Sequence, residues 1–333
     1  MKTLITVSHQ PMLDKVSSPE AFEKLASFSD ITVIPPGLPY SNDDLARDIA
    51  DYDAVFTTWG SPKVTAEALA NAKKLKFVGH MAGSVIPYVD PIIFDTDITV
   101  CNANYPLARA TAEGAFAMMF YGARDMGTLA VRLKNGGWFD NSSETVTGVY
   151  GTDIGLIGYG EISREVVSML KPFDCNIRMY SRHLTDSQAS DMGIQRASLE
   201  DVLTKSDIIS LHSTYTPSTE KMIGKSEFAM MRDNTVFVNT ARGPIIDEDA
   251  LIAELQSGRL RACLDVFCQE PLPTSSELLK LDNVLCLPHT AGTNKYWNNT
   301  LMQSIVDDFE CVLEGREPRG LIDLDRFNRL TPR

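Results

Sequence analysis

Short apolar runs rich in β-branched residues alternate with segments of helical periodicity along the first hundred residues. The runs lie at residues 4–7, 31–34, 54–57, 76–78 and 98–101, and segments such as 18–28 and 65–72 separate them. A second alternation has apolar runs at 154–157, 176–180, 208–211, 236–239, 262–266 and 284–287, with helical segments at 161–170, 199–204, 226–231 and 248–257. Strand and helix in alternation predict an α/β protein with two doubly wound parallel sheets, the first flavodoxin-like and the second a six-stranded Rossmann sheet.

Two long helical segments flank the second alternation. Residues 108–132 have the pattern of a single helix that is apolar on more than one face, as at Ala112, Phe116 and Met119. Such a helix is buried either in the core between two domains or at a subunit interface, and the pattern leaves both open. Residues 293–313 predict a second long helix, which is amphipathic.

Length and charge narrow the class of protein. A chain of 333 residues, 44% of them hydrophobic, is long enough for about two folded domains. Lys and Arg number 31 against 44 Asp and Glu, and the resulting net charge of −13 makes nucleic acid and membrane surfaces improbable partners. A small anionic ligand would therefore need local donors, such as a buried arginine or backbone amides.

The cysteines and the apolar runs bear on the compartment. The six cysteines form no Cys-x-x-Cys pair and no zinc-ligand spacing, so we expect reduced thiols and no metal site. The first apolar run is too short for a signal peptide, and no run approaches the roughly 18 residues of a membrane span. These features favour a cytoplasmic protein.

A glycine turn follows the apolar run 154–157. It comprises Gly158, Tyr159, Gly160, Glu161 and Ile162. Gly158 permits a tight turn, Gly160 allows the backbone to approach a pyrophosphate, and the helix that opens here supplies free N–H groups. Ser163 takes the third glycine position of the G-x-G-x-x-G pattern, and we expect this small residue to fit. Between strand and helix the turn predicts a dinucleotide site, with a purely structural turn as the alternative.

The end of the next strand bears on the choice of cofactor. About 20 residues beyond the turn, where an acid would bind the ribose hydroxyls of NAD, stand Ser181, Arg182 and His183. A hydroxyl and a guanidinium can bind a 2′-phosphate, so we predict that NADP(H) is preferred over NAD(H). The alternative is that Arg182 is solvated or stacks on adenine.

The histidines are the candidate proton donors. They are His9, His80, His183, His212 and His289. Hydride transfer to a carbonyl also needs a proton, which histidine can donate near neutral pH. His289 follows a strand and Pro288, at the carboxyl end of the sheet where ligands bind in such folds. His212 also ends a strand, where it fits a wall of the cofactor site or a supporting position equally well.

Charged residues end the two preceding strands. Arg242 follows the run 236–239, and Asp265 and Glu270 lie at the end of the run 262–266. Together with His289, Arg242 and Glu270 would supply a bidentate clamp for a carboxylate, an acid/base, and a carboxylate that stabilises the imidazolium. From spacing alone, an Arg or Glu at a strand end is more often a solvated cap than a catalytic group.

Four segments of the chain together resemble the D-isomer-specific 2-hydroxyacid dehydrogenase family. They are residues 158–163, 238–247, 264–273 and 287–292, and the match runs in order over essentially the whole chain. The resemblance implies that Arg242 binds the substrate carboxylate and carbonyl oxygen, that His289 is the acid/base, and that Glu270 pairs with it. Ser181 and Arg182 depart from the pattern, because they replace the acidic ribose-binding residue.

The resemblance extends to further contacts. Around the cofactor we place Thr111, His212, Thr240, Ala241, Asp265 and Gly292. Gly83 and Ser84 match a loop whose backbone N–H groups hold the substrate carboxylate. Trp59, together with Tyr88, is a candidate lining of the pocket for the substrate side chain, and otherwise a core aromatic.

These features predict an oxidoreductase that interconverts a 2-keto acid and a D-2-hydroxy acid with NADP(H) or NAD(H). We expect a substrate domain of residues 1–105 plus 295–333, a cofactor domain of residues 106–294, and an active site in the cleft between them. The helix at 108–132 favours a homodimer formed through the cofactor domain. The alternative is a dinucleotide-sensing binding protein that resembles a co-repressor and has no significant turnover.

Overall fold

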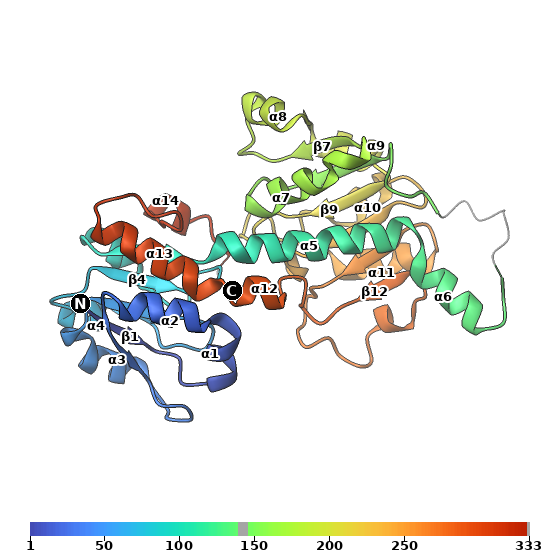
Figure 1. Cartoon of the computed structure of the whole chain (residues 1–333). Coiled ribbons are helices and arrows are strands. Elements are labelled where there is room, and N and C mark those ends of the chain that lie inside the picture. Colours follow the sequence, from blue (N-terminus) through green and yellow to red (C-terminus); the bar gives the residue numbers. More distant parts are fainter. Residues whose placement is uncertain (139–145, 332–333) are drawn as a thin grey trace. The chain divides into compact units, whose positions relative to one another are not determined.

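The chain folds into two compact α/β units, each built on a parallel sheet. The computed structural model shown in Figure 1 describes residues 1–138 and 146–331. The first unit consists of Met1–Leu107 and the segment from Thr293 onward, and the second consists of Ala108–Gly292. The predicted fold class is confirmed. No helix in the described part of the chain has the length and apolar character needed to cross a membrane.

The first unit has a sheet of five parallel strands in the order β2-β1-β3-β4-β5, which is the flavodoxin-like order. The strands are β1 (Lys2–Ile5), β2 (Asp30–Val33), β3 (Ala54–Thr57), β4 (Phe77–His80) and β5 (Thr99–Asn102). The helices among them are α1 (Gln10–Val16), α2 (Pro19–Ala26), α3 (Asn42–Asp48) and α4 (Ala66–Asn71). All four residues of β3 and of β4 are buried, as expected where helices cover both faces of a parallel sheet.

A helix from the far end of the chain completes the first unit. Helix α13 (Leu301–Leu313) packs on the sheet, and the ring of Phe309 stacks on that of Phe77 with centroids 4.9 Å apart. A Cβ at Gly79 of β4 would overlap the side chain of Ile305, so the helix lies directly on the sheet backbone. The short helix α14 (Leu324–Phe327) follows.

The second unit has seven parallel strands in the order β12-β11-β10-β9-β6-β7-β8. They are β6 (Asp153–Ile157), β7 (Asn176–Tyr180), β8 (Gln195–Arg196), β9 (Ile208–Leu211), β10 (Val236–Asn239), β11 (Arg261–Leu264) and β12 (Val284–Cys286). The helices are α7 (Glu161–Leu170), α8 (Asp186–Met192), α9 (Leu199–Lys205), α10 (Lys225–Met230) and α11 (Glu248–Gln256). Alternate residues of one strand enter different cores: Val236 and Val238 pack in one cluster and Phe237 in the other.

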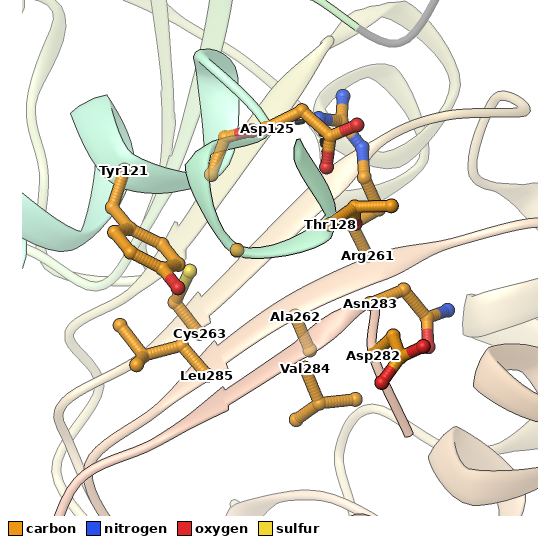
Figure 2. Close-up of a pocket in the computed structure, with 12 residues that line it drawn as sticks. Tyr121, Asp125, Thr128, Arg261, Ala262, Cys263, Asp282, Asn283, Val284 and Leu285 are labelled. Atoms are coloured by element: carbon orange, nitrogen blue, oxygen red, sulfur yellow. Dashed lines mark hydrogen bonds and ion pairs between the residues drawn. The ribbon is translucent and has the colours of Figure 1, made fainter. Parts of the chain in front are cut away.

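The two predicted long helices are each interrupted. The segment predicted as one helix at 108–132 forms α5 (Asn104–Ala123) and α6 (Met126–Lys134), separated by Asp125 with a left-handed φ of 48°. The carboxylate of Asp125 lies 3.8 Å from the guanidinium of Arg261, which donates a hydrogen bond to the Gly122 carbonyl (2.7 Å). Both charged side chains are buried, and a small pocket opens beside them (Figure 2). A buried charge pair thus lies at the point where α5 ends.

The predicted helix at 293–313 is likewise divided. It begins as α12 (Lys295–Asn298), which ends where the Thr300 hydroxyl and N–H both donate to the Trp297 carbonyl, and it resumes as α13. Threonine competes with the helical pattern through this local bond. The second sheet also has one strand more than predicted, because β8 has only two residues, both polar and exposed.

Candidate functional site

The glycine turn between β6 and α7 leaves room for a ligand. Gly158 has a φ of +109°, and a Cβ there would lie 2.5 Å from the Ser213 nitrogen, so only glycine fits. Gly160 is the N-cap of α7, and a Cβ on it would meet nothing within 4 Å. Ser163 is fully buried, accepts a hydrogen bond from the Gly160 N–H (2.9 Å) and donates to the Gly160 carbonyl (3.2 Å). Serine therefore fits the third position by bonding to the turn itself.

Buried polar atoms beside this turn lack protein partners. Both ring nitrogens of His212 and the hydroxyl of Thr240 form no hydrogen bond within residues 1–138 and 146–331. His212 follows β9 and Thr240 follows β10, so both lie at the same edge of the sheet as the turn after β6. Burial lowers the pKa of His212 to about 4, which keeps it neutral and removes it as a proton donor at neutral pH. Unpaired polar atoms beside a glycine cradle fit a polar ligand such as a dinucleotide.

The residues after β7 present polar groups at the same edge of the sheet. The hydroxyl of Ser181 accepts a hydrogen bond from the His183 N–H (3.2 Å), which closes the turn after Tyr180. Arg182 is exposed, and its side chain has no ion pair with any described residue. Its guanidinium is therefore available to a ligand.

The turn after β10 fixes Arg242. Asn239 braces it, accepting from the Ala241 N–H (3.0 Å) and donating to the Arg242 carbonyl (3.1 Å). A Cβ at Gly243 would overlap the backbone of Phe267, so the turns after β10 and β11 touch. Burial lowers the pKa of the Arg242 guanidinium and the negative charge of Glu270 opposes this shift, so the group stays charged.

Glu270 and His289 form a direct pair. The Nδ1 atom of His289 lies 2.7 Å from Oε2 of Glu270, while Oε1 of Glu270 accepts from the Phe267 N–H (3.0 Å). One carboxylate oxygen thus accepts from the backbone and the other lies at Nδ1 of His289, so Nε2 is the ring nitrogen that faces away from Glu270. The His289 side chain is 49% exposed, so a ligand can reach it.

Asp265 holds the turn that carries His289. Its buried carboxylate accepts from the N–H groups of Thr290 (2.7 Å) and Ala291 (2.9 Å), and its carbonyl accepts from the His289 N–H (2.9 Å). Burial raises the pKa of Asp265 and the two amide bonds oppose this shift. Both carboxylate oxygens are bound to the turn, so Asp265 positions His289.

Helix α5 supports the same turn from another side. A Cβ at Gly114 would lie 2.6 Å from the Ala291 carbonyl oxygen and 2.7 Å from its Cα, so the helix backbone touches the turn just before Gly292. Thr111 lies three residues earlier, on the same face of the helix. Sequence reasoning missed Gly114, for which a glycine within an apolar helix was the only signal.

The candidate residues of the first unit lie in the loops after β3 and β4. The carbonyl of Gly83 accepts from the Asn102 side chain and the Ser84 hydroxyl donates to the Thr331 carbonyl (2.5 Å), whereas their N–H groups donate to no described residue. Trp59 is 37% exposed, which excludes a core position. Tyr88 stacks on His80 with ring centroids 4.4 Å apart.

A glycine turn between strand and helix, with Arg, Glu and His at neighbouring strand ends, defines a dinucleotide-binding α/β protein with acid/base groups. Residues 116–291 match the family model described as D-isomer specific 2-hydroxyacid dehydrogenase, NAD binding domain. The chain belongs to the D-isomer specific 2-hydroxyacid dehydrogenase family.

Known relatives extend this similarity beyond the matched domain. The chain is 31% identical over 300 residues to a D-3-phosphoglycerate dehydrogenase of Methanocaldococcus jannaschii, which covers 88% of this chain and 56% of that protein. It is 29% identical over 312 residues to a glyoxylate reductase of Aeropyrum pernix, covering 92% and 93%. A glyoxylate reductase structure from Paecilomyes thermophila shares the fold, with a TM-score of 0.76, 24% identity and coverage of 97% and 98%. The chain spans about half the length of the phosphoglycerate dehydrogenases of M. jannaschii (56%) and Archaeoglobus fulgidus (54%).

Proposed function

We propose that the protein catalyses the reversible reduction of a 2-keto acid to a D-2-hydroxy acid with a nicotinamide cofactor. The observation that carries this proposal is the 2.7 Å pair of His289 and Glu270, in a unit that matches an NAD-binding family model and that places Arg242 in the turn after β10. The bound cofactor supplies the hydride, and the chain's own residues bind and orient the acid and move the proton.

His289 is the acid/base of the proposed reaction. In the reductive direction, protonated His289 donates from Nε2 to the carbonyl oxygen of the keto acid. Glu270 stabilises the imidazolium through Nδ1 and fixes the plane of the ring. In the oxidative direction, neutral His289 accepts the hydroxyl proton at the same atom.

Arg242 binds the anionic substrate. A guanidinium matches a carboxylate in a bidentate geometry, and its burial strengthens the interaction with the charge that develops on the carbonyl oxygen. In the first unit, the N–H groups of Gly83 and Ser84 are the proposed further donors to the carboxylate, and Trp59 is the proposed wall of the side-chain pocket. Local donors of this kind suit an anionic ligand on a chain of net charge −13.

The cofactor site is proposed at the carboxyl edge of the second sheet. Its residues are Thr111, Gly158, Tyr159, Gly160, Glu161, Ile162, His212, Thr240, Ala241, Asp265 and Gly292, with Ser181 and Arg182 at the ribose. Because no acid follows β7, we infer that NADP(H) is preferred over NAD(H). Initial rates with NADPH and NADH test this, for the natural chain and for Arg182→Ala. Arg196→Ala is the matched control, because Arg196 is already paired with Asp186. A clear NADH preference in the natural chain would refute the inference.

We also infer a homodimer formed through the cofactor unit of a cytoplasmic enzyme. Helix α5 buries Ala112, Ala115 and Met119 in the core of the cofactor unit. We therefore place the proposed subunit contact on α6. No described residue of α6 is buried, and Met126 and Leu133 are 48% and 58% exposed. The mass measured by light scattering should be that of a dimer for the natural chain and that of a monomer for Leu133→Glu. A monomeric natural chain would contradict the inference.

The activity is tested with glyoxylate, hydroxypyruvate, pyruvate and phenylpyruvate in the presence of each cofactor. We expect turnover of at least one acid, its loss in Arg242→Ala with cofactor binding retained, and a fall of about 10²- to 10⁴-fold in His289→Ala. Tight cofactor binding without turnover of any acid would instead favour a dinucleotide-sensing protein. Wild-type turnover in His289→Ala would refute the acid/base assignment.

A further inference from the structure

Two loops that follow β3 and β4 are joined at the carboxyl edge of the first sheet. The hydroxyl of Thr58 donates to the Met81 carbonyl (3.3 Å), and the Met81 N–H donates to the Thr57 carbonyl (2.8 Å). The turn formed by Thr58, Trp59 and Gly60, called the Trp59 turn below, therefore lies beside the loop that contains Gly83 and Ser84.

The Trp59 turn is held in a defined geometry. Gly60 has a left-handed φ of +81°, and its N–H donates to the Tyr88 hydroxyl (3.4 Å). Tyr88 in turn stacks on His80, whose Nδ1 lies 2.9 Å from the Thr57 hydroxyl. The turn is thus fixed, and the Trp59 indole that it carries forms a platform that is still 37% exposed.

A lysine lies over this platform. The Nζ atom of Lys15, in α1, lies 5.7 Å from the centroid of the Trp59 ring. Lys15 is half-buried and makes no ion pair within the described ranges 1–138 and 146–331. The adjacent carboxylate, that of Asp14, accepts a hydrogen bond from the Gln10 side chain (2.6 Å). Lys63, which follows the Trp59 turn in sequence, pairs with Asp90 (3.8 Å).

An ammonium group over an indole face is stabilised there without being neutralised. On a chain of net charge −13, a half-buried cation without a carboxylate partner is a local positive site. We propose that Lys15, held over Trp59, binds a second anionic group of the substrate, a carboxylate or phosphate on the carbon beyond the keto group. This inference rests on the proposed function and adds the substrate class: 2-keto acids that carry a distal anion.

The test compares matched acids that differ only at the distal group. Oxaloacetate is paired with 2-oxobutyrate, and 3-phosphohydroxypyruvate with hydroxypyruvate, so the two pairs separate a distal carboxylate from a distal phosphate. Lys15→Met should lower kcat/KM by about tenfold or more for the charged member of at least one pair, mainly through KM, as expected for the loss of one charge-assisted hydrogen bond. The uncharged members should change by less than about twofold.

Two further variants provide the controls. Lys15→Arg should retain the preference for the charged acid, and Lys63→Met should leave it unchanged, because Lys63 is already paired. Equal effects of Lys15→Met on both members of both pairs would overturn the inference.

Failure of the proposed function gives a different result. If no acid is turned over, calorimetric binding of the same four acids still judges the role of Lys15. Tighter binding of a charged member, lost in Lys15→Met, supports the subsite. Equal binding of charged and uncharged members overturns it.

Discussion

Substitution of Gly114 by alanine should impair turnover far more than stability. The added Cβ would lie 2.6 Å from the Ala291 carbonyl oxygen and 2.7 Å from its Cα. Because non-bonded heavy atoms pack at about 3.5–4.0 Å, the turn that carries His289 must move by about 1 Å. Overpacking of this kind costs about 1–3 kcal/mol, and exchanging glycine for alanine within a helix returns about 1 kcal/mol. The expected net destabilisation is therefore only about 0–2 kcal/mol.

Catalysis is more sensitive to the same displacement. A misplacement of about 1 Å can lower turnover by about 10²-fold. The assay is kcat for the best acid of the panel, with thermal unfolding measured in parallel. Gly122→Ala is the matched control, because it lies in the same helix and would overlap Val236 and not the His289 turn. Wild-type kcat in Gly114→Ala, or an equal loss of kcat in Gly122→Ala, would refute the reasoning.

The remaining predictions concern the turn, the cofactor and pH. Asp265→Asn leaves one of two backbone N–H groups without an acceptor, so it should destabilise the fold by about 1–3 kcal/mol in urea unfolding and lower kcat. Gly158→Ala places a Cβ 2.5 Å from a backbone nitrogen, and NADPH titration by fluorescence should show lost binding. Burial lowers the pKa of His80 to about 3 and of His212 to about 4, both below the unfolded value of 6.5. The unfolded chain therefore takes up protons first as the pH falls below 6.5, and each imidazole should remove about 1.4 kcal/mol of stability per pH unit. His80→Gln should reduce this slope, and an unchanged slope would contradict the assignment.

The central strands of both sheets were predictable because β3, β4, β9, β10 and β11 are buried on both faces. The run Val236–Asn239 predicts a buried strand by itself, because its first three residues are apolar and Asn239 ends the strand. Strand β8 carries no such signal, because Gln195 and Arg196 join the sheet only through backbone bonds to β7. At the break after α5, Asp125 pairs with Arg261, which lies far along the chain, so this buried contact could not be predicted from the local sequence.

The candidate site divides in the same way. The positions of Arg242 and His289 at strand ends follow from the alternation of strand and helix. The support of the His289 turn does not, because Asp265 and Gly114 act through contacts with residues distant in sequence. The role of Asp265 as a brace emerged only from its two backbone bonds, since its sequence position suggested a ligand-facing acid.

His289 has a φ of 53°, a left-handed backbone conformation that residues other than glycine adopt at a cost of about 1–2 kcal/mol. The residue proposed to move the proton therefore stands at a position where glycine would give a more stable backbone. Selection for thermal stability alone should enrich His289→Gly among surviving variants, and those variants should be inactive. Stability and catalysis are set against each other at a single backbone torsion, so engineering of this protein must screen for both properties together.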